Sequence, residues 1–254
     1  MGDALLDARQ IVKHYGSVEA LRGASFQARA GEVTALIGDN GAGKSTLIKC
    51  LSGAEQPTSG RILLDGKEIH LDSPTTARRL GIETVYQDLA VAPDLDPAAN
   101  LFLGREIPRR GILGKLGMLD KAEMRRRSVE EFKRLGVTLQ SADVPIGSLS
   151  GGQRQSVAVA RSVVWASKVV FMDEPTAALG VVQRERVLEV IRRVRDEGIA
   201  VVLISHNMPE VISVADRIEV LRLGTRVARF TAADATLENL VAAMTGALTQ
   251  EEVP

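Results

Sequence analysis

Short apolar runs alternate with longer, charge-rich segments along most of the chain. Three apolar runs carry no charged residue and are typical of strands buried on both faces: 33–37, 169–172 and 200–204. Four mixed segments place apolar residues at helical spacing and are predicted to be helices: 120–136, 151–166, 181–195 and 207–214. Strands that alternate with helices predict a mostly parallel sheet covered by helices.

The first quarter of the chain has a different pattern. Short strands separated by glycines or charged residues are predicted at 5–12, 24–28 and 61–64. The middle segment 120–136 is charge-rich and is predicted to be a helix, with Gly136 at its C-terminal cap. Its apolar residues Met124, Val129, Phe132 and Leu135 stand at rough helical spacing. We therefore expect the first strands and the central helices to form separate lobes.

Composition narrows the class of protein. Only 3% of the 254 residues are aromatic while 45% are apolar, so the core must be built from aliphatic side chains. Lys plus Arg and Asp plus Glu are both 32, and this balance argues against nucleic-acid binding. Cys50 is the single cysteine, which fits a reducing compartment. With no signal peptide and no apolar run of about 18 residues, we expect a soluble, cytoplasmic chain.

A glycine-rich loop follows the apolar run 33–37 and precedes a predicted helix. It matches the pattern G-x-x-x-x-G-K-[ST] through Gly38, Asp39, Asn40, Gly41, Ala42, Gly43, Lys44 and Ser45, with Thr46 continuing the helix. The glycines let successive N–H groups point inward around an anion, and the helix N-terminus adds partial positive charge. Lys44 is predicted to reach the terminal phosphates of a nucleotide, and Ser45 to offer its hydroxyl to Mg²⁺.

Two carboxylates follow the apolar run 169–172. Asp173 is predicted to hold Mg²⁺, and Glu174 to orient or deprotonate the attacking water. Without the glycine-rich loop this acidic pair would mean little. With it, the sequence predicts a nucleoside triphosphatase with ATP and Mg²⁺ as ligands.

A third motif, Leu149-Ser150-Gly151-Gly152-Gln153, opens the helix before this strand. Taken alone, Ser150 would be a helix N-cap. Together with the two motifs above, it resembles the LSGGQ signature of ABC-type transport ATPases. The resemblance implies an α/β fold: a P-loop NTPase core with a mostly parallel sheet, an antiparallel β-subdomain and a helical subdomain that carries the signature. It also implies a homodimer in the ATP-bound state, in which each ATP lies between one subunit's phosphate loop and the signature of the other.

The same resemblance assigns three further residues. Tyr15 matches the aromatic residue that stacks on adenine, Gln87 the glutamine that reaches Mg²⁺ and the water, and His206 the histidine that contacts the γ-phosphate. The alternatives are an ordinary tyrosine at a strand end and a solvated turn glutamine. One residue departs from the family: Gly180 stands where an aspartate is usual, which puts the coupling between the two ATP sites in doubt.

The resemblance covers one ABC-type domain over 4–245, with a helical subdomain at about 88–165 and a short tail at 246–254. Several stretches look most like bacterial monosaccharide importers of the ribose, xylose and fructose group, and the single ATPase domain resembles the fructose type. This implies membrane permease partners, indirectly a periplasmic sugar-binding protein, and a peripheral location on the cytoplasmic face of the inner membrane. The alternatives are a soluble ABC-type ATPase and a scaffold that binds nucleotide without hydrolysis.

One segment is expected to dock the membrane partner. Between Gln87 and Arg110 it carries six apolar residues close together, Leu89, Val91, Leu95, Leu101, Phe102 and Leu103. We expect part of this set to line a surface groove for a permease helix. The alternative is a small helical lobe packed on itself.

Overall fold

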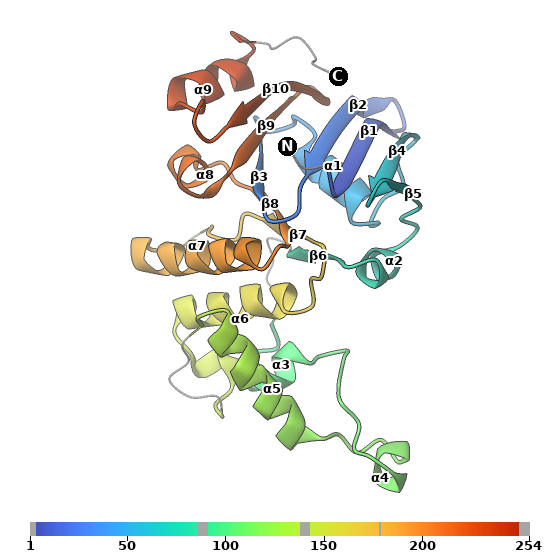
Figure 1. Cartoon of the computed structure of the whole chain (residues 1–254), viewed down its shortest axis with the longest axis vertical. Coiled ribbons are helices and arrows are strands. Elements are labelled where there is room, and N and C mark those ends of the chain that lie inside the picture. The colour runs from blue at the N-terminus through green and yellow to red at the C-terminus, as the bar shows by residue number, and fades with distance from the viewer. Residues whose placement is uncertain (1–3, 86–90, 138–142, 178, 249–254) are drawn as a thin grey trace. The chain divides into compact units, whose positions relative to one another are not determined.

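The computed structural model describes residues 4–85, 91–137, 143–177 and 179–248. The chain divides into two compact units (Figure 1). The first holds described residues 4–85, 166–175 and 194–248, and the second holds 91–137, 143–165 and the described part of 176–193. The expectation of one ABC-type domain over 4–245 with a helical part at 88–165 stays a prediction.

A six-stranded sheet with one antiparallel edge forms the centre of the first unit. In spatial order its strands are β10 (Thr225–Thr231), β9 (Arg217–Arg222), β3 (Val33–Ile37), β8 (Ala200–Ile204), β7 (Val169–Asp173) and β6 (Ile82–Val85). All neighbours run parallel except β10 and β9. Every residue of β3 and β8 is buried, which explains their uninterrupted apolar sequence. The predicted mostly parallel sheet is confirmed.

A second, antiparallel sheet of four strands belongs to the same unit. Its order is β2 (Val18–Ala28), β1 (Leu6–Tyr15), β4 (Ser59–Leu64) and β5 (Lys67–Ile69). The first two strands are longer than the predicted 5–12 and 24–28, because they form a hairpin in which Tyr15 pairs with Val18 across Gly16 and Ser17. The exposed end of this hairpin lacks the apolar alternation on which the prediction relied.

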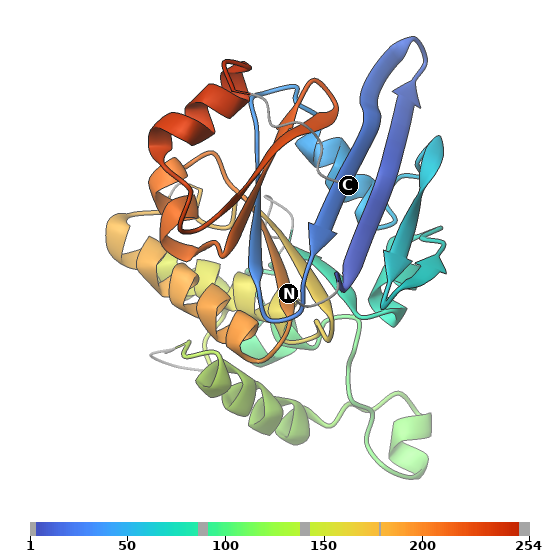
Figure 2. The ribbon, with the colours of Figure 1, turned by 45° about the horizontal axis from the view of Figure 1, so that its top comes forward.

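Helix α1 (Lys44–Leu51) shares one hydrophobic core with both sheets. It contributes Leu47, Ile48, Cys50 and Leu51 to a cluster that also holds Phe26 of β2 and Phe171 of β7. Figure 2 shows this helix beside the blue β1–β2 hairpin. Cys50 is fully buried, and burial raises the pKa of its thiol to about 11. This unit also contains α2 (Pro74–Arg79), α8 (Met208–Val214) and α9 (Leu237–Thr245).

The second unit is helical. It contains α3 (Pro97–Leu101), α4 (Ile112–Lys115), α5 (Lys121–Arg134), the 3-10 turn η1 (Ile146–Ser148), α6 (Gly151–Val163) and most of α7 (Val181–Asp196). Trp165 joins α3 to the end of α6: its Nε1 donates to the Leu101 carbonyl at 3.1 Å, and its ring meets Phe102 edge-on at 5.4 Å. Leu101 and Phe102 are buried, as a self-packed lobe requires.

Helix α5 buries a serine on its inner face. Its buried residues are Met124, Ser128 and Phe132, whereas Val129 is 48% exposed. The repeat of four residues puts Ser128 on the same face as Met124 and Phe132. Gly136 follows with φ +70°, which confirms the predicted cap.

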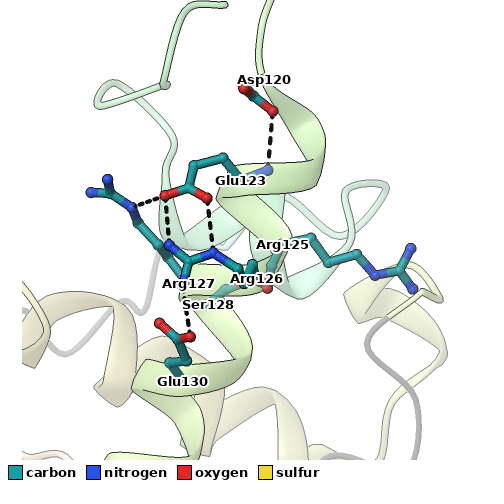
Figure 3. Close-up of polar contacts among 7 residues, drawn as sticks. All are labelled: Asp120, Glu123, Arg125, Arg126, Arg127, Ser128 and Glu130. Carbon is teal, nitrogen blue, oxygen red and sulfur yellow. Dashed lines mark hydrogen bonds and ion pairs between the residues drawn. The ribbon is translucent and has the colours of Figure 1, made fainter.

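The outer face of α5 carries a compact set of ion pairs. The side chain of Asp120 accepts the N–H of Glu123 at 3.1 Å and so caps the helix. Glu123 in turn accepts from Arg126 and Arg127, and Arg126 also reaches Glu130 (Figure 3). Paired arginines of this kind belong to a solvated helix surface. In the described part of the chain, no helix combines the length and apolar character needed to cross a bilayer.

Candidate nucleotide site

The glycine-rich loop connects β3 to the first turn of α1. Gly43 precedes the helix with φ +102°, and no side chain caps the helix start. The first N–H groups of a helix have no partner within it, so those of Lys44, Ser45 and Thr46 are available to an anion. Nζ of Lys44 donates to the carbonyls of Gly38 and Asp39, at 2.7 and 3.0 Å, and so closes the loop around its own amine.

Two glycines of the loop are required by close contacts. A Cβ on Gly38 would lie 2.2 Å from the Leu221 carbonyl, and one on Gly43 would lie 2.8 Å from the Ala20 carbonyl. Both glycines also have positive φ. Gly41, by contrast, has open space around it, as a loop crest facing a ligand would have. The backbone of the loop is therefore held tightly against β2 and β9 while its crest stays accessible.

A pocket of about 410 Å³ opens beside this loop, and all of its lining lies in the first unit. Tyr15, at the end of β1 and 42% exposed, forms one wall with Val18 and Ala20. The loop from Asn40 to Thr46 lines the same pocket. An aromatic side chain and a helix start in one pocket suit a ligand that carries both a base and phosphates. The structure thus brings Tyr15 and the loop residues Asn40–Thr46 to one pocket, while Gly38 and Asp39 are not part of its lining.

The neighbouring strands β7 and β8 bring acidic and imidazole groups together. Asp173 ends β7 and is in register with Ile204 of β8, so the residues that follow both strands emerge side by side. His206 Nδ1 lies 2.8 Å from Oε1 of Glu174, and the N–H of Glu174 donates to the Ile204 carbonyl at 2.9 Å. Glu174 has φ +50°, a strained conformation for a residue with a side chain. The backbone is thus held so that the carboxylate meets the imidazole.

The amine of Lys44 in the loop and the carboxylates at the end of β7 influence one another's pKa values. Burial lowers the pKa of Lys44, while Glu174, Asp39 and Asp173 counteract this shift. Burial also raises the pKa of Asp173, Glu174 adds to the shift, and Lys44 opposes it. These mutual effects place the amine of Lys44 in the field of the carboxylates at the end of β7. A ligand that carries negative phosphates and a bound cation would place the phosphates at the amine of Lys44 and the cation at the carboxylates.

The residues present fit a magnesium ion that is shared with a nucleotide. Mg²⁺ prefers oxygen donors, and the hydroxyl of Ser45 and the carboxylate of Asp173 are of that kind. Among the described residues there is no group of three or more His, Cys, Asp or Glu that could hold a metal. Few protein ligands are typical of Mg²⁺ that is also bound by phosphates.

The signature motif begins helix α6 in the second unit. Ser150 is its N-cap: Oγ accepts the N–H of Gln153 at 3.3 Å, and Oε1 of Gln153 accepts the N–H of Ser150 at 3.2 Å. This capping box leaves the hydroxyl proton of Ser150 free to be donated elsewhere. A Cβ on Gly152 would lie 2.3 Å from Cγ of Gln183, whereas Gly151 has open space. Ser150 and Gly151 are therefore presented outward.

Gln87 and Gly180 complete the set of predicted positions. Gln87 lies outside the described residues, so its predicted role stays a prediction. Gly180, where an aspartate was expected, precedes α7, and a Cβ there would lie 2.7 Å from Oε1 of Gln183. Gln183 therefore occupies space beside both Gly152 and Gly180. Sequence reasoning did not single out Gln183, because a polar residue in the first turn of a helix carries no distinctive signal.

The family model described as ABC transporter matches residues 21–177. The chain belongs to the ABC transporter family. This ABC transporter chain is 53% identical over 247 residues to "Fructose import ATP-binding protein FrcA" of Rhizobium meliloti, with 96% of this chain and 95% of that protein covered. It is 43% identical to "Xylose/arabinose import ATP-binding protein XylG" of Sulfolobus acidocaldarius, over 95% of this chain and 94% of the relative.

Longer relatives and solved structures agree with this family. "Ribose import ATP-binding protein RbsA 1" of Rubrobacter xylanophilus is 42% identical over 98% of this chain, which spans about half (48%) of that protein. Among solved structures, the ADP conformation of MJ1267, an ATP-binding cassette of an ABC transporter, has a TM-score of 0.79 at 26% identity and covers 96% of both chains. The α/β P-loop fold that the sequence predicted for this ABC transporter chain is confirmed.

Sequence reasoning missed part of the pocket. Val18, Glu19 and Arg22 line it beside Tyr15, because the β1–β2 hairpin folds back immediately after the tyrosine. The turn Gly16-Ser17 between two strand-like runs was the available signal.

Proposed function

We propose that this chain is the ATP-binding and ATP-hydrolysing subunit of an importer, and that it drives uptake of a monosaccharide through a separate permease. The observation that carries the hydrolytic part is the contact between His206 and Glu174, 2.8 Å apart at the ends of adjacent strands. It lies in the same unit as an uncapped phosphate loop and an aromatic-walled pocket.

Each residue has a role that follows from its position. Tyr15 stacks on the base, while the N–H groups of the loop and Nζ of Lys44 bind the β- and γ-phosphates. Glu174 orients the attacking water and accepts its proton, since it is the acid held next to the histidine. His206 is exposed and contacts Glu174 through Nδ1, so its Nε2 faces the γ-phosphate and donates an N–H to it in the doubly protonated ring.

Ser45 and Asp173 would hold Mg²⁺, with Gln87 as a third proposed ligand. When bound, the ion neutralises charge that develops on the phosphates. Asp173 is suited to this because burial and Glu174 already disfavour its charge, so a cation nearby relieves an existing cost.

The second unit supplies the other half of each site in a homodimer. The outward Ser150 and Gly151 would face the γ-phosphate of an ATP bound to the partner subunit, where the free hydroxyl proton of Ser150 becomes a donor. This arrangement accounts for a motif that otherwise serves only as a helix cap. Two bound ATP molecules would hold the dimer together.

The transported substrate is proposed from the relatives. Proteins named for fructose, xylose/arabinose and ribose import align with nearly the whole of this chain, and the one named for fructose shares 53% identity. The subunit would act at the cytoplasmic face of the membrane, with permease subunits and a periplasmic sugar-binding protein as partners. The segment 87–110 would contact the permease through Leu95 and Leu103, 36% and 43% exposed, since Leu101 and Phe102 are used in the interior.

Phosphate release by the purified chain tests the enzymatic part. Lys44→Ala should reduce turnover by at least ~10²-fold, because the terminal phosphates lose their cation. Lys49→Ala, which removes an exposed lysine from the same helix, is the matched control and should not change the rate. An unchanged rate in Lys44→Ala would overturn the assignment. ATP-driven sugar uptake in proteoliposomes with the permease tests the transport part, and hydrolysis without uptake would favour a soluble ATPase.

A further inference from the structure

A projecting segment of the second unit, residues 107–119, combines exposed aliphatic side chains with unpaired basic ones. Its sequence is IPRRGILGKLGML, which contains three basic residues and no acidic one in a chain whose net charge is zero. We refer to these residues as the basic tip. The nucleotide site makes no use of them.

Backbone contacts connect the two ends of the basic tip. Pro108 and Leu119 form an antiparallel bridge, the N–H of Arg109 donates to the Met118 carbonyl at 2.8 Å, and that of Asp120 donates to the Ile107 carbonyl at 2.7 Å. A Cβ on Gly114 would lie 1.8 Å from the Arg109 carbonyl, so α4 packs directly against the chain that enters it. The chain of the tip is therefore closed by backbone hydrogen bonds at its base and by the close packing of α4 on the segment that enters it.

Those apolar side chains lie in solvent. Helix α4 has no buried residue, and Ile112 and Leu116 are 76% and 74% exposed, with Leu113 and Met118 each at 45%. In Figure 1 the helix lies at the far end of the second unit, beyond the start of α5. Single exposed aliphatic residues are common on protein surfaces, but a cluster of them in one short projecting segment indicates a binding surface.

Within the basic tip every charged side chain is basic, and the acidic residues Glu106 and Asp120 flank its base. Arg109, Arg110 and Lys115 are exposed, and no described carboxylate forms an ion pair with any of them. By contrast, Arg126 and Arg127 of α5 are already paired with Glu123. Aliphatic side chains flanked by unpaired basic ones match the chemistry of an anionic bilayer surface, where acyl chains lie beneath negative headgroups.

We infer that the basic tip binds directly to an anionic lipid surface, with Ile112 and Leu116 entering the interface and Arg109, Arg110 and Lys115 contacting headgroups. This contact goes beyond the proposed ATPase function and does not depend on it. It would hold the subunit at the membrane independently of its permease.

Flotation of the full chain with lipid vesicles tests the inference. We expect binding to vesicles of phosphatidylcholine mixed with phosphatidylglycerol, and little binding to phosphatidylcholine alone. Arg109→Gln/Arg110→Gln should weaken the partition coefficient roughly 25-fold, at about fivefold for each basic residue near the surface. Ile112→Ser/Leu116→Ser should weaken it by at least ~tenfold.

Matched controls separate the tip from general surface effects. Leu237→Ser/Val241→Ser replaces two exposed aliphatic residues on α9, and Arg61→Gln/Lys67→Gln removes two exposed charges from the antiparallel sheet. Neither should change vesicle binding. All substitutions are at exposed positions, so thermal melting should stay within about 2 °C of the parent.

Three results would overturn the inference. The first is equal binding to neutral and anionic vesicles. The second is full binding by both tip variants. The third is a lack of binding of the parent chain to anionic vesicles. If Ile112→Ser/Leu116→Ser then abolishes permease binding in detergent, the tip docks protein and not lipid. ATP hydrolysis by the tip variants should equal that of the parent chain.

Discussion

Nδ1 of His206 and Oε1 of Glu174 lie 2.8 Å apart, and the two residues follow the ends of β8 and β7, which are adjacent in the parallel sheet. The imidazole is 78% exposed, whereas the carboxylate is only 15% exposed. The inner group is therefore held in place and the outer one faces solvent, where a phosphate would arrive. This asymmetry suits a fixed acid that handles water and an accessible histidine that senses the substrate.

Replacing Glu174 should separate binding from turnover. We expect Glu174→Gln to retain ATP binding and to lower phosphate release by ~10²–10⁴-fold, because an amide of similar shape is a poor base. It should also accumulate an ATP-bound dimer on size-exclusion chromatography. Glu189→Gln, at an exposed position of α7, is the control. A Glu174→Gln chain that stays monomeric and hydrolyses ATP normally would contradict both the role and the dimer.

Asp173 gives a pH-dependent prediction. Its pKa is raised by burial and by Glu174, so the folded chain holds a proton over a pH range in which the unfolded chain has lost it. Stability of the nucleotide-free protein therefore falls as pH rises from the ordinary aspartate value through this raised pKa. Asp173→Asn removes that loss and should raise the melting temperature at neutral pH by about 1–2 °C.

The advantage of Asp173→Asn should vanish in acid, where aspartate is neutral in both the folded and the unfolded chain. Thermal melting across pH measures it. The same variant should lose Mg²⁺-dependent turnover, since a ligand is missing. If the variant were less stable than the parent at neutral pH, the charge of Asp173 would already be well compensated in the folded chain, and its pKa would not be raised.

Ser150 has two separable tasks. As the N-cap of α6 it should contribute about 1 kcal/mol, which Ser150→Ala removes and Ser150→Asp retains. If its hydroxyl also serves a phosphate, both variants should lose turnover, and aspartate more so because its charge repels the phosphate. Urea unfolding and phosphate release distinguish the two effects. Thr236→Ala, which removes the N-cap of α9, should cost similar stability without changing turnover. Normal turnover in Ser150→Asp would leave Ser150 a cap only.

Gly180 can be tested together with Gln183. Gly180 is not in the left-handed region, so an aspartate is compatible with its backbone, but its Cβ would meet Oε1 of Gln183 at 2.7 Å. We expect Gly180→Asp/Gln183→Ala in the assembled transporter to raise the Hill coefficient of hydrolysis for ATP, with Gln183→Ala as the control. Coupling of about 1–3 kcal/mol is typical between linked sites, so the change should be measurable. An unchanged coefficient would mark Gly180 as a turn residue only.

The sequence predicted best those strands in which nearly every side chain is buried. β3, β7 and β8 are buried on both faces, so their apolar runs identified them. β5 and β6 were missed because three- and four-residue strands with charged or polar positions give no pattern. The apolar pattern of 120–136 could not show that Ser128, a polar residue, is buried in α5 while Val129 is exposed.

The site divides in a similar way. Lys44, Glu174 and His206 could be located because each follows a buried strand, and the carboxyl ends of parallel strands share one edge. The contact between Glu174 and His206 could not be predicted from the sequence. That contact depends on the register of Asp173 with Ile204 and on the left-handed φ of Glu174, both of which are set by packing. The sequence also could not show that Gln183 lies beside Gly152 and Gly180.

The buried cysteine has a practical consequence for spectroscopy. Cys50 lies on the buried face of α1, and with a thiol pKa of about 11 it carries little of the thiolate that maleimides attack. The native cysteine should therefore react little with maleimide probes, and cysteines introduced elsewhere can be labelled selectively. One cysteine introduced at exposed Ser17 and another at exposed Lys121 would each accept a probe, one in each compact unit. Distances between such probes would follow the two units through ATP binding, hydrolysis and release without removal of a native residue.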